Sequence, residues 1–258
     1  VKTARSAMLL ADVTPGLQAQ VQALRRDLDE VTALRQLQQQ ASNHMQKGLV
    51  GAQLARTKLS QAMSGRRDLP QRFVEDPLQT AVLIAATETL AAFANSVGLI
   101  ATEEMTTALP DIAGQKGRLA MPVRGQLLRL KDEADAAGVV RPGIVLATRP
   151  RALVTAPTAA TIRYGGPLLD YGQVLILEPQ KDTLFVLAGL AQVYGKIGQV
   201  VPAGSPLGLM GGQIPQLDAI LSQSRDGTGI DRTETLYIEV RQGHTPVDPL
   251  DWFTSQKD

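Results

Sequence analysis

Apolar residues along the first third of the chain follow the spacing of an amphipathic helix. The residues that carry this 4-3-4-3 spacing are Leu17, Val21, Leu24, Leu28 and Val31. Polar and charged residues lie between them, which is the pattern of a coiled-coil seam. The pattern loosens after Leu34, where a glutamine-rich stretch interrupts the heptads. We therefore predict a helical coiled-coil arm over residues 1–70 that needs a partner helix.

The chain itself offers one candidate partner for this arm. Residues 4–13 are helical by pattern, and the Thr-Pro-Gly of residues 14–16 predicts either a bend or a helix start with proline just inside it. A bend there allows residues 4–13 to pair with part of the arm. The alternative interpretation is a plain helical hairpin that only spaces domains.

A second helix, of different character, is predicted from residue 78 to residue 101. Residues 64–70 break the arm, and Asp76, Pro77 and Gln79 then form a helix start. Glu88 is the one charged residue in this helix, whose prominent apolar residues include Leu78, Val82, Leu83, Leu90, Phe93 and Val97. About 20 apolar residues would span a bilayer, but the Gln, Thr, Asn and Ser residues here argue against that. We expect the helix to bury more than one face.

From residue 118 the pattern changes to short apolar runs separated by turns, which is typical of a β domain. Strands are predicted over residues 127–130, 152–156, 160–164, 173–177, 183–187 and 236–240, with turns at Gly165-Gly166, Gly172, Gly195 and Gly204. Residues 213–234 are expected to form a short helix and a flexible loop beside a groove. The predicted fold is α+β and multidomain: an arm (1–70), a helix with its connector (71–117) and a mainly antiparallel β domain (118–258).

Composition removes several functional classes. A net charge of +1 and 3% aromatic residues leave no footprint for nucleic acid. The absence of cysteine excludes thiol catalysis, disulfides and thiolate metal sites. The glycine-rich residues 208–212 lack the Gly-Lys-Ser/Thr ending of a phosphate loop. No charged segment followed by an apolar stretch opens the chain, so we expect no signal peptide within it and interpret Val1 as a processed or artificial start.

Three segments of the β domain carry a resemblance to the lysostaphin/LytM class of zinc peptidases. Arg141-Pro142-Gly143-Ile144-Val145 stands where that class has His-x-Gly-x-Asp. Residues 193–204 (VYGKIGQVVPAG) resemble its xVKxGQxVKxG turn, and residues 235–241 (TLYIEVR) fall on its HxHFEIR strand. The resemblance runs from Met121 to Phe253.

The resemblance implies that the metal chemistry of the class is missing here. By this match the zinc ligands are replaced by Arg141, Val145 and Tyr237, and the two assisting histidines by Gly189 and Thr235. A catalytic zinc needs about three converging His, Asp or Glu side chains. The chain's two histidines, His44 and His244, belong to the helical arm and to a turn. We therefore expect no metal, no cofactor and no catalytic residues.

A coiled coil, an apolar helix and a metal-free LytM-like domain in this order resemble the EnvC-type activators of cell-wall amidases. The resemblance implies a non-enzymatic periplasmic protein that binds and activates an N-acetylmuramoyl-L-alanine amidase. It also implies that the coiled coil docks on FtsX, so that the FtsEX complex controls the activator in cell division. Residues 7–10 (AMLL) are a candidate remnant of the FtsX-facing tip.

Carried over from that family, the amidase-binding groove consists of Val145, Tyr171, Val174, Leu187, Tyr237 and Arg241. Apolar walls, two tyrosines and one arginine suit the gripping of a helix. For Val174 and Leu187 a role in the core is an equal alternative. In the resting form a helix of the activator occupies the groove, and we predict that residues 78–101 are this helix, with a hinge at residues 65–70.

Three other functions compete with this prediction. The LytM-like pattern raises an active zinc endopeptidase, which bound zinc and turnover would revive. A glycan hydrolase would need a facing pair of carboxylates, for which candidates are Asp132, Glu133, Asp135, Glu178 and Glu239. A passive module would hold peptidoglycan in the groove without any amidase.

Overall fold

The computed structural model describes residues 2–64, 69–100, 111–212 and 234–254. The chain divides into two compact units, one up to Thr57 and the other from Lys58 onward. The predicted helix and loop of residues 213–234 lie outside the described residues, apart from Glu234.

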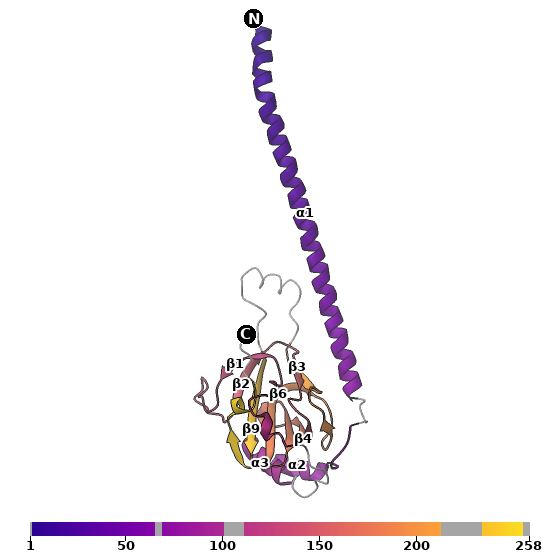
Figure 1. Cartoon of the computed structure of the whole chain (residues 1–258), viewed down its shortest axis with the longest axis vertical. Coiled ribbons are helices and arrows are strands. Elements are labelled where there is room, and N and C mark those ends of the chain that lie inside the picture. Colours follow the sequence, from indigo (N-terminus) through magenta and orange to yellow (C-terminus); the bar gives the residue numbers. More distant parts are fainter. Residues whose placement is uncertain (1, 65–68, 101–110, 213–233, 255–258) are drawn as a thin grey trace. The chain divides into compact units, whose positions relative to one another are not determined.

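The arm is one continuous helix, α1 (Lys2–Ser64) (Figure 1). It passes through residues 14–16 without interruption, so the predicted bend is wrong and residues 4–13 do not fold back on the arm. A proline removes one backbone hydrogen bond, and the turns on either side continue the helix. The apolar stripe is exposed within its own unit, with Leu24 63% and Leu28 59% accessible. Its pairing in a coiled coil stays a prediction.

The second unit is built on antiparallel strands, as predicted. Its strands are β1 (Gly125–Arg129), β2 (Ile144–Thr148), β3 (Leu153–Thr155), β4 (Ala160–Pro167), β5 (Gln173–Gln180), β6 (Thr183–Val193), β7 (Val200–Val201), β8 (Pro206–Met210), β9 (Glu234–Gln242) and β10 (Thr245–Val247). The main path runs β1-β2-β9-β6-β5-β4-β7, and β3, β8 and β10 pair at its sides. Short 3-10 turns are η1 (Ala113–Gln115), η2 (Leu169–Tyr171) and η3 (Pro249–Asp251).

The strand predictions were incomplete, and one predicted turn needs correction. The predicted turn at Gly165-Gly166 lies inside β4, where both glycines pair with β5. The glycine-rich residues 208–212 overlap β8, which pairs with β6. The strand β2 was not predicted, although it overlaps the motif segment of residues 141–145. In each case long-range pairing, which a local pattern does not report, decides the conformation.

Alternate residues of the central strands separate two apolar clusters. On β6, Phe185 and Leu187 join the larger cluster, which also holds Trp252 and Phe253. Val186 and Ala188 of the same strand join the second cluster. This is the period-two alternation expected of a strand that is buried on both faces.

The predicted apolar helix is two helices, α2 (Pro77–Ala86) and α3 (Leu90–Ile100). Asp76 is the predicted N-cap and accepts hydrogen bonds from the backbone N–H groups of Leu78 and Gln79. Thr87 is extended, with φ −111° and ψ 128°, and ends α2. Thr89 then receives the N–H of Ala92 on its hydroxyl. The Thr-Glu-Thr sequence therefore turns the chain, so that each helix meets the sheet separately.

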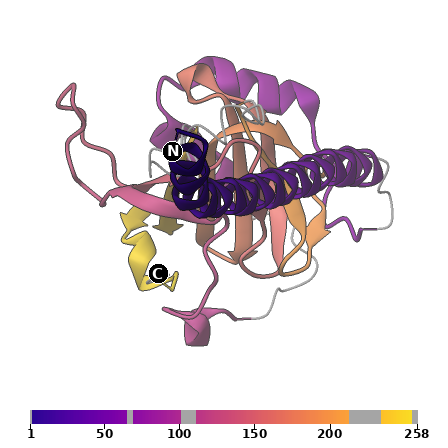
Figure 2. The same ribbon diagram turned by 90° about the horizontal axis from the view of Figure 1, so that it is seen from above.

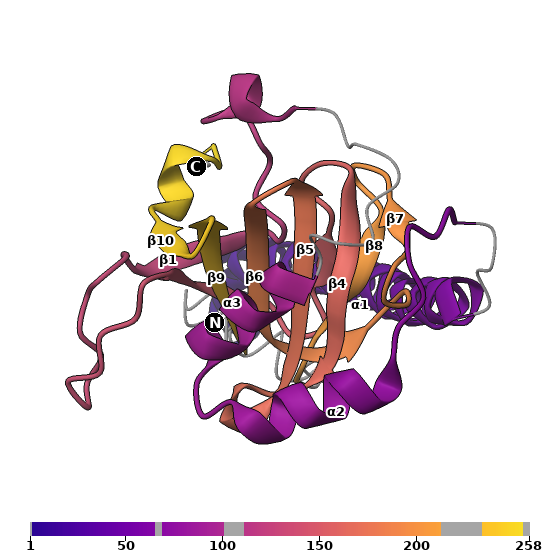
Figure 3. The same ribbon diagram turned by 90° about the horizontal axis from the view of Figure 1, so that it is seen from below.

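Figure 2 shows α2 and α3 (purple) on one side of the sheet, and in Figure 3 α3 crosses β9, β6 and β5. Contacts of α3 with residues of β4, β5, β6 and β9 confirm this placement. In the described part of the chain, none of the helices combines the length and apolarity of a membrane span. The predicted order of a helical arm followed by an antiparallel β domain is confirmed.

The segment before α2 is fastened to the edge of the sheet. Arg72 donates its backbone N–H to Gly198 O at 2.8 Å, and Val200 donates to Pro70 O at 2.8 Å. A Cβ on Gly198, whose φ is 85°, would lie 1.9 Å from Phe73 O, so only glycine permits this approach. Of the predicted hinge, residues 65–68 lie outside the described residues, while Leu69 belongs to the larger core cluster. The end of the hinge nearer α2 is therefore anchored.

Candidate binding groove and metal position

The helix-facing side of the sheet is an apolar surface covered by α3. Leu90, Phe93, Ala94 and Val97 bury one side of α3 against this surface, and each is at most 8% exposed. The rings of Phe93 and Tyr164 meet edge to face, with centroids 4.7 Å apart and planes at 75°. Such aromatic pairs add to the free energy gained from burial alone. The helix therefore has a defined position on the sheet.

A buried polar chain crosses the same surface along β9. The Tyr237 hydroxyl donates to Glu239 Oε2 at 2.7 Å, and Arg241 forms an ion pair with the same carboxylate. Arg241 Nη2 also donates to Asn95 Oδ1 on α3 at 2.7 Å and to His244 O at 2.8 Å. Burial, together with the charge of Glu239, raises the pKa of Tyr237 well above its usual range. Tyr237 is therefore a neutral hydrogen-bond donor whose proton is held by Glu239.

A cavity of about 740 Å³ opens on the sheet beside the start of α3. All five positions predicted from the zinc-peptidase resemblance line it: Arg141, Val145, Gly189, Thr235 and Tyr237. Glu88, in the link between α2 and α3, lines it as well. Five residues that are far apart in the chain, each selected by its position in a motif, therefore lie together in the fold. We call this space the cavity.

Two arginines at the cavity share one acidic partner. Asp135 Oδ2 lies 3.1 Å from Arg141 Nη1 and 3.9 Å from Arg129 Nη1. The same side chain accepts the backbone N–H groups of Val139 and Ala137 at 2.9 Å. These hydrogen bonds, that of Val139 first, and the nearby guanidinium groups hold the pKa of Asp135 below its usual range, against the effect of burial. Asp135 therefore stays charged and positions both arginines.

Glycines shape the floor of the cavity. Gly189 has φ 95°, and a Cβ there would lie 2.6 Å from Thr235 O on the neighbouring strand. A histidine at this assisting position would therefore strain the backbone. A Cβ on Gly143 would lie 2.7 Å from the ring of Tyr237. Close approach of β2, β6 and β9 thus favours glycine at both places.

The predicted groove residues are mostly on the helix-facing side. Val174 and Tyr237 belong to its apolar cluster, and Val145 and Tyr171 pack against that cluster. Arg241 contacts α3 through Asn95. Leu187 lies in the core cluster on the opposite face, which is the alternative that the sequence left open for it. Val186 and Ala188 occupy this side of β6 instead. The alternation of side chains between the two faces of a strand would have selected them.

The residues predicted for the covering helix also form two groups, those that face the sheet and those that are exposed. Leu90, Phe93 and Val97 face the sheet, and Leu83 of α2 packs at its margin. Leu78 and Val82 are 78% and 67% exposed, so their predicted burial is wrong. The break at residues 87–89 is the physical reason, since it sets α2 in a different orientation from α3. Asn95 and Arg129 were missed as site residues, because nothing local marks their long-range partners.

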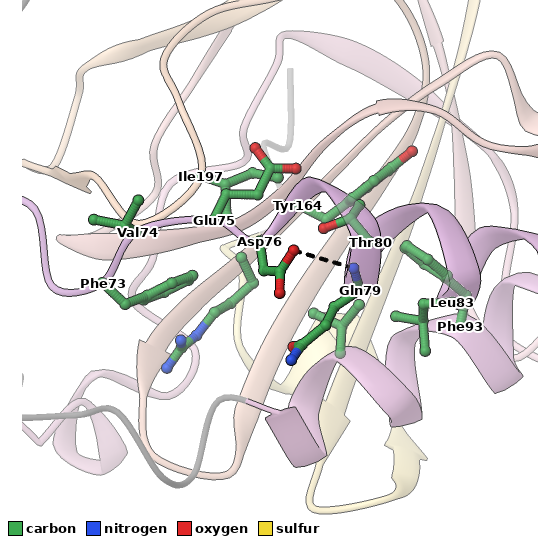
Figure 4. Close-up of a pocket in the computed structure, with 12 residues that line it drawn as sticks. Phe73, Val74, Glu75, Asp76, Gln79, Thr80, Leu83, Phe93, Tyr164 and Ile197 are labelled. Carbon is green, nitrogen blue, oxygen red and sulfur yellow. Dashed lines mark hydrogen bonds between the residues drawn. The ribbon is translucent and has the colours of Figure 1, made fainter.

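A second, smaller cavity of about 140 Å³ lies between these helices and the sheet (Figure 4). It is lined by apolar residues such as Leu83, Phe93 and Val97, and by the polar residues Glu75 and Arg163. Val74, Asp76 and Gln79 in its lining are exposed, so this cavity is open to solvent at the margin of the helix layer.

Part of the chain matches a known protein family. Residues 140–249 match Peptidase family M23. An uncharacterized protein of Neisseria meningitidis serogroup B is 27% identical over 137 residues, or 53% of this chain and 20% of that protein. The chain thus spans about a fifth of the length of this curated relative.

The solved structures found by comparison are more distant in sequence. A putative M23 peptidase of Pseudomonas aeruginosa is 20% identical with a TM-score of 0.41, covering 58% of this chain and 56% of that one. The catalytic domain of lysostaphin from Staphylococcus simulans is 17% identical with a TM-score of 0.38, covering 49% and 90%.

The residues at the cavity do not fit the zinc ion that this family implies. A guanidinium, an isopropyl group, a glycine and a hydroxyl offer no set of strong ligands. The phenol of Tyr237 is neutral and already donates to Glu239. His244 is exposed in the turn between β9 and β10, and His44 belongs to the other unit. Within the described ranges, no three His, Cys, Asp or Glu side chains are grouped closely enough to hold a metal.

Four of the five candidate carboxylates for a glycan hydrolase are engaged with cations. Glu178 is buried against Arg163, and Glu239 against Arg241. Burial raises the pKa of Glu178, while Arg163 acts in the opposite direction. Asp135 pairs with Arg141, and Asp132 pairs with Lys131. Glu133 accepts the backbone N–H of Leu130 in a turn. These contacts explain the five residues as structural groups.

Proposed function

We propose that this protein is a non-catalytic activator of an N-acetylmuramoyl-L-alanine amidase. In this proposal the amidase binds the helix-facing side of the sheet, and α3 restrains the activator by occupying that surface. The protein acts in the periplasm during cell division. This function follows the resemblance to the EnvC-type activators.

One observation carries the proposal: α3 covers the apolar surface of the sheet beside the cavity. The match to Peptidase family M23 supports a role connected with peptidoglycan. The residues at the cavity lack zinc ligands, which favours binding over hydrolysis. The contacts of Phe93 and Asn95 with the sheet favour a restraint that is both apolar and polar.

The arm provides the proposed link to FtsX. Its apolar stripe is exposed in its own unit, which supports a partner for that surface. In the proposal the arm docks on the extracytoplasmic part of FtsX, and the FtsEX complex moves it. The structure does not describe the side chains of residues 7–10, the candidate FtsX-facing tip. Because residues 70–73 are fastened to the sheet, movement of the arm must first loosen that segment before it reaches α3.

The test uses the full chain and a single substitution on α3. Asn95→Lys places a cation beside Arg241, and like charges at this distance repel. We expect this variant to release α3 and to raise the rate at which purified cognate amidase solubilises labelled peptidoglycan by about tenfold. A rise of that size corresponds to about 1.4 kcal/mol of lost restraint. The matched control is Ala92→Lys, on the exposed side of α3.

The outcomes separate the competing functions. Equal stimulation by the wild type and both variants would mean that α3 does not restrain the protein. Absence of any stimulation, together with binding to sacculi, would favour the passive scaffold. Cleavage of peptidoglycan without amidase, dependent on added zinc, would favour the endopeptidase.

A further inference from the structure

The contacts of α3 define the kind of segment that this surface accepts. Leu90, Phe93 and Val97 recur at intervals of three and four residues, which is one face of a helix. Ala94 is fully buried where a larger side chain would hold the helix away from the sheet. Asn95 supplies a hydrogen-bond acceptor to Arg241. A competing segment needs the same helical pattern, with an acceptor beside its central apolar residues.

A partner that only copied α3 would compete poorly. Because α3 is tethered to the sheet, its effective concentration is about millimolar. A free partner must therefore make contacts that α3 does not make. The cavity of about 740 Å³ beside the start of α3 is the space where such contacts are available.

The chemistry of the cavity favours an acidic group. Arg129 and Arg141 both line it, and Asp135 holds them in place from one side. Among the described residues, no ion pair joins either arginine to Asp170 or to Glu88, the two acidic residues that also line the cavity. Glu88 belongs to the link before α3, so it leaves the cavity when α3 is released. The guanidinium N–H groups that Asp135 does not use can then receive a carboxylate.

We propose that this surface recognises a helix longer than α3, whose amino-terminal extension places a carboxylate on Arg129 and Arg141 in the cavity. The remainder of the helix takes the places of Leu90, Phe93, Ala94, Asn95 and Val97. This inference rests on the proposed function, because it describes the segment by which the amidase binds. It explains how a free partner displaces a tethered helix: the cavity adds contacts that α3 leaves unused.

The test measures binding of synthetic peptides to the full chain carrying Asn95→Lys. The first peptide has the sequence of residues 87–100 with Glu88→Gln and a fluorescent label. Two others carry one added amino-terminal turn, Ala-Glu-Ala-Ala or Ala-Gln-Ala-Ala. Both extensions are expected to tighten binding. The glutamate form should bind about tenfold more tightly than the glutamine form, the size expected of a charge-assisted hydrogen bond.

Receptor variants identify the source of that preference. Arg141→Gln and Arg129→Gln, each combined with Asn95→Lys, should reduce or abolish it, with the β-domain circular dichroism unchanged as the check of folding. The receptor with Ala92→Lys, in which α3 stays in place, should bind all three peptides more weakly. Equal affinity for the glutamate and glutamine peptides would overturn the proposal. So would a glutamate preference that survives both arginine replacements.

The peptide experiment is independent of the amidase experiment. A glutamate preference without any amidase stimulation would support the surface as a helix site and reject the amidase as its partner. Amidase stimulation by Asn95→Lys without a glutamate preference would support the activator role. It would overturn the proposal that the cavity binds a carboxylate of the partner helix.

Discussion

The two faces of the central strands are equally buried but differently closed. Phe185 on one face and Phe93 against the other are both 0% exposed. The first face is closed by the chain's own strands and by Trp252 and Phe253, which pack on Phe185. The second is closed by α3, an 11-residue helix with a cavity at its start and another beneath it. Exposure alone therefore does not distinguish a core from an occupied binding surface.

The polar groups on the two faces show the same contrast. The first face carries aliphatic and aromatic side chains, with Thr148 and Thr183 continuing the alternation of Leu146 and Phe185. The second surface carries Tyr237, Glu239 and Arg241, with Asn95 of α3 completing their hydrogen bonds. Removing α3 would expose apolar side chains of the second cluster together with polar groups that water can satisfy, whereas opening the first face would expose mostly hydrocarbon. The second face is therefore the one that can open at moderate cost in free energy.

The largest effect is expected on the first face. Phe185→Ala should lower the free energy of unfolding by about 3–5 kcal/mol, as for other fully buried phenylalanines. The cavity it leaves is enclosed by strands that cannot close over it. Denaturant unfolding of the full chain measures the loss, and Leu130→Ala, at a position that is 49% exposed, is the control. A loss no larger than that of the control would contradict the division of the two faces.

The matched substitution on the second face should cost less. Phe93→Ala removes the same side chain, but α3 can leave the sheet, so the loss is limited to the free energy that holds the helix in place. We expect a smaller decrease in unfolding free energy than for Phe185→Ala, faster amide exchange confined to α3, and more amidase stimulation. Hydrogen exchange and the peptidoglycan assay measure these changes. An equal loss of global stability in the two variants would place α3 within the core.

The smallest effect on stability is expected from Asp135, which pairs with the two arginines at the cavity. The pKa of Asp135 is lower in the folded chain than the ordinary value of about 3.9. Its contribution to stability is therefore present above that value and is lost as the pH falls through the folded-state pKa. Asp135→Asn should be less stable than the wild type at neutral pH, and the difference should shrink on acidification below pH 4. Unfolding measured across this range tests it, and a difference independent of pH would contradict the charge as its source.

Local patterns predicted most elements of the fold because they report local causes. Asp76, Pro77 and Gln79 mark the start of α2 through backbone hydrogen bonds within one turn. Six of the metal-position and groove residues, all selected by motif comparison, line one cavity. The break at Thr87 was missed although Thr89 marks the start of α3 locally, because the apolar residues continue on both sides of it. For Leu187 the sequence left groove and core open, because the resemblance carried a position across without the alternation of β6.

The sequence by itself determined the chemistry that is available: no cysteine, two histidines in unrelated segments, and an arginine, a valine and a tyrosine where a zinc peptidase has ligands. It also determined the helical arm and the antiparallel β domain. Only the tertiary structure decided which residues share a face, that Asn95 meets Arg241, and that Asp135 joins Arg129 to Arg141. The physical reason is range: helix starts and apolar periodicity arise from neighbours in the chain, whereas a groove is made by side chains whose strands are paired by the whole sheet.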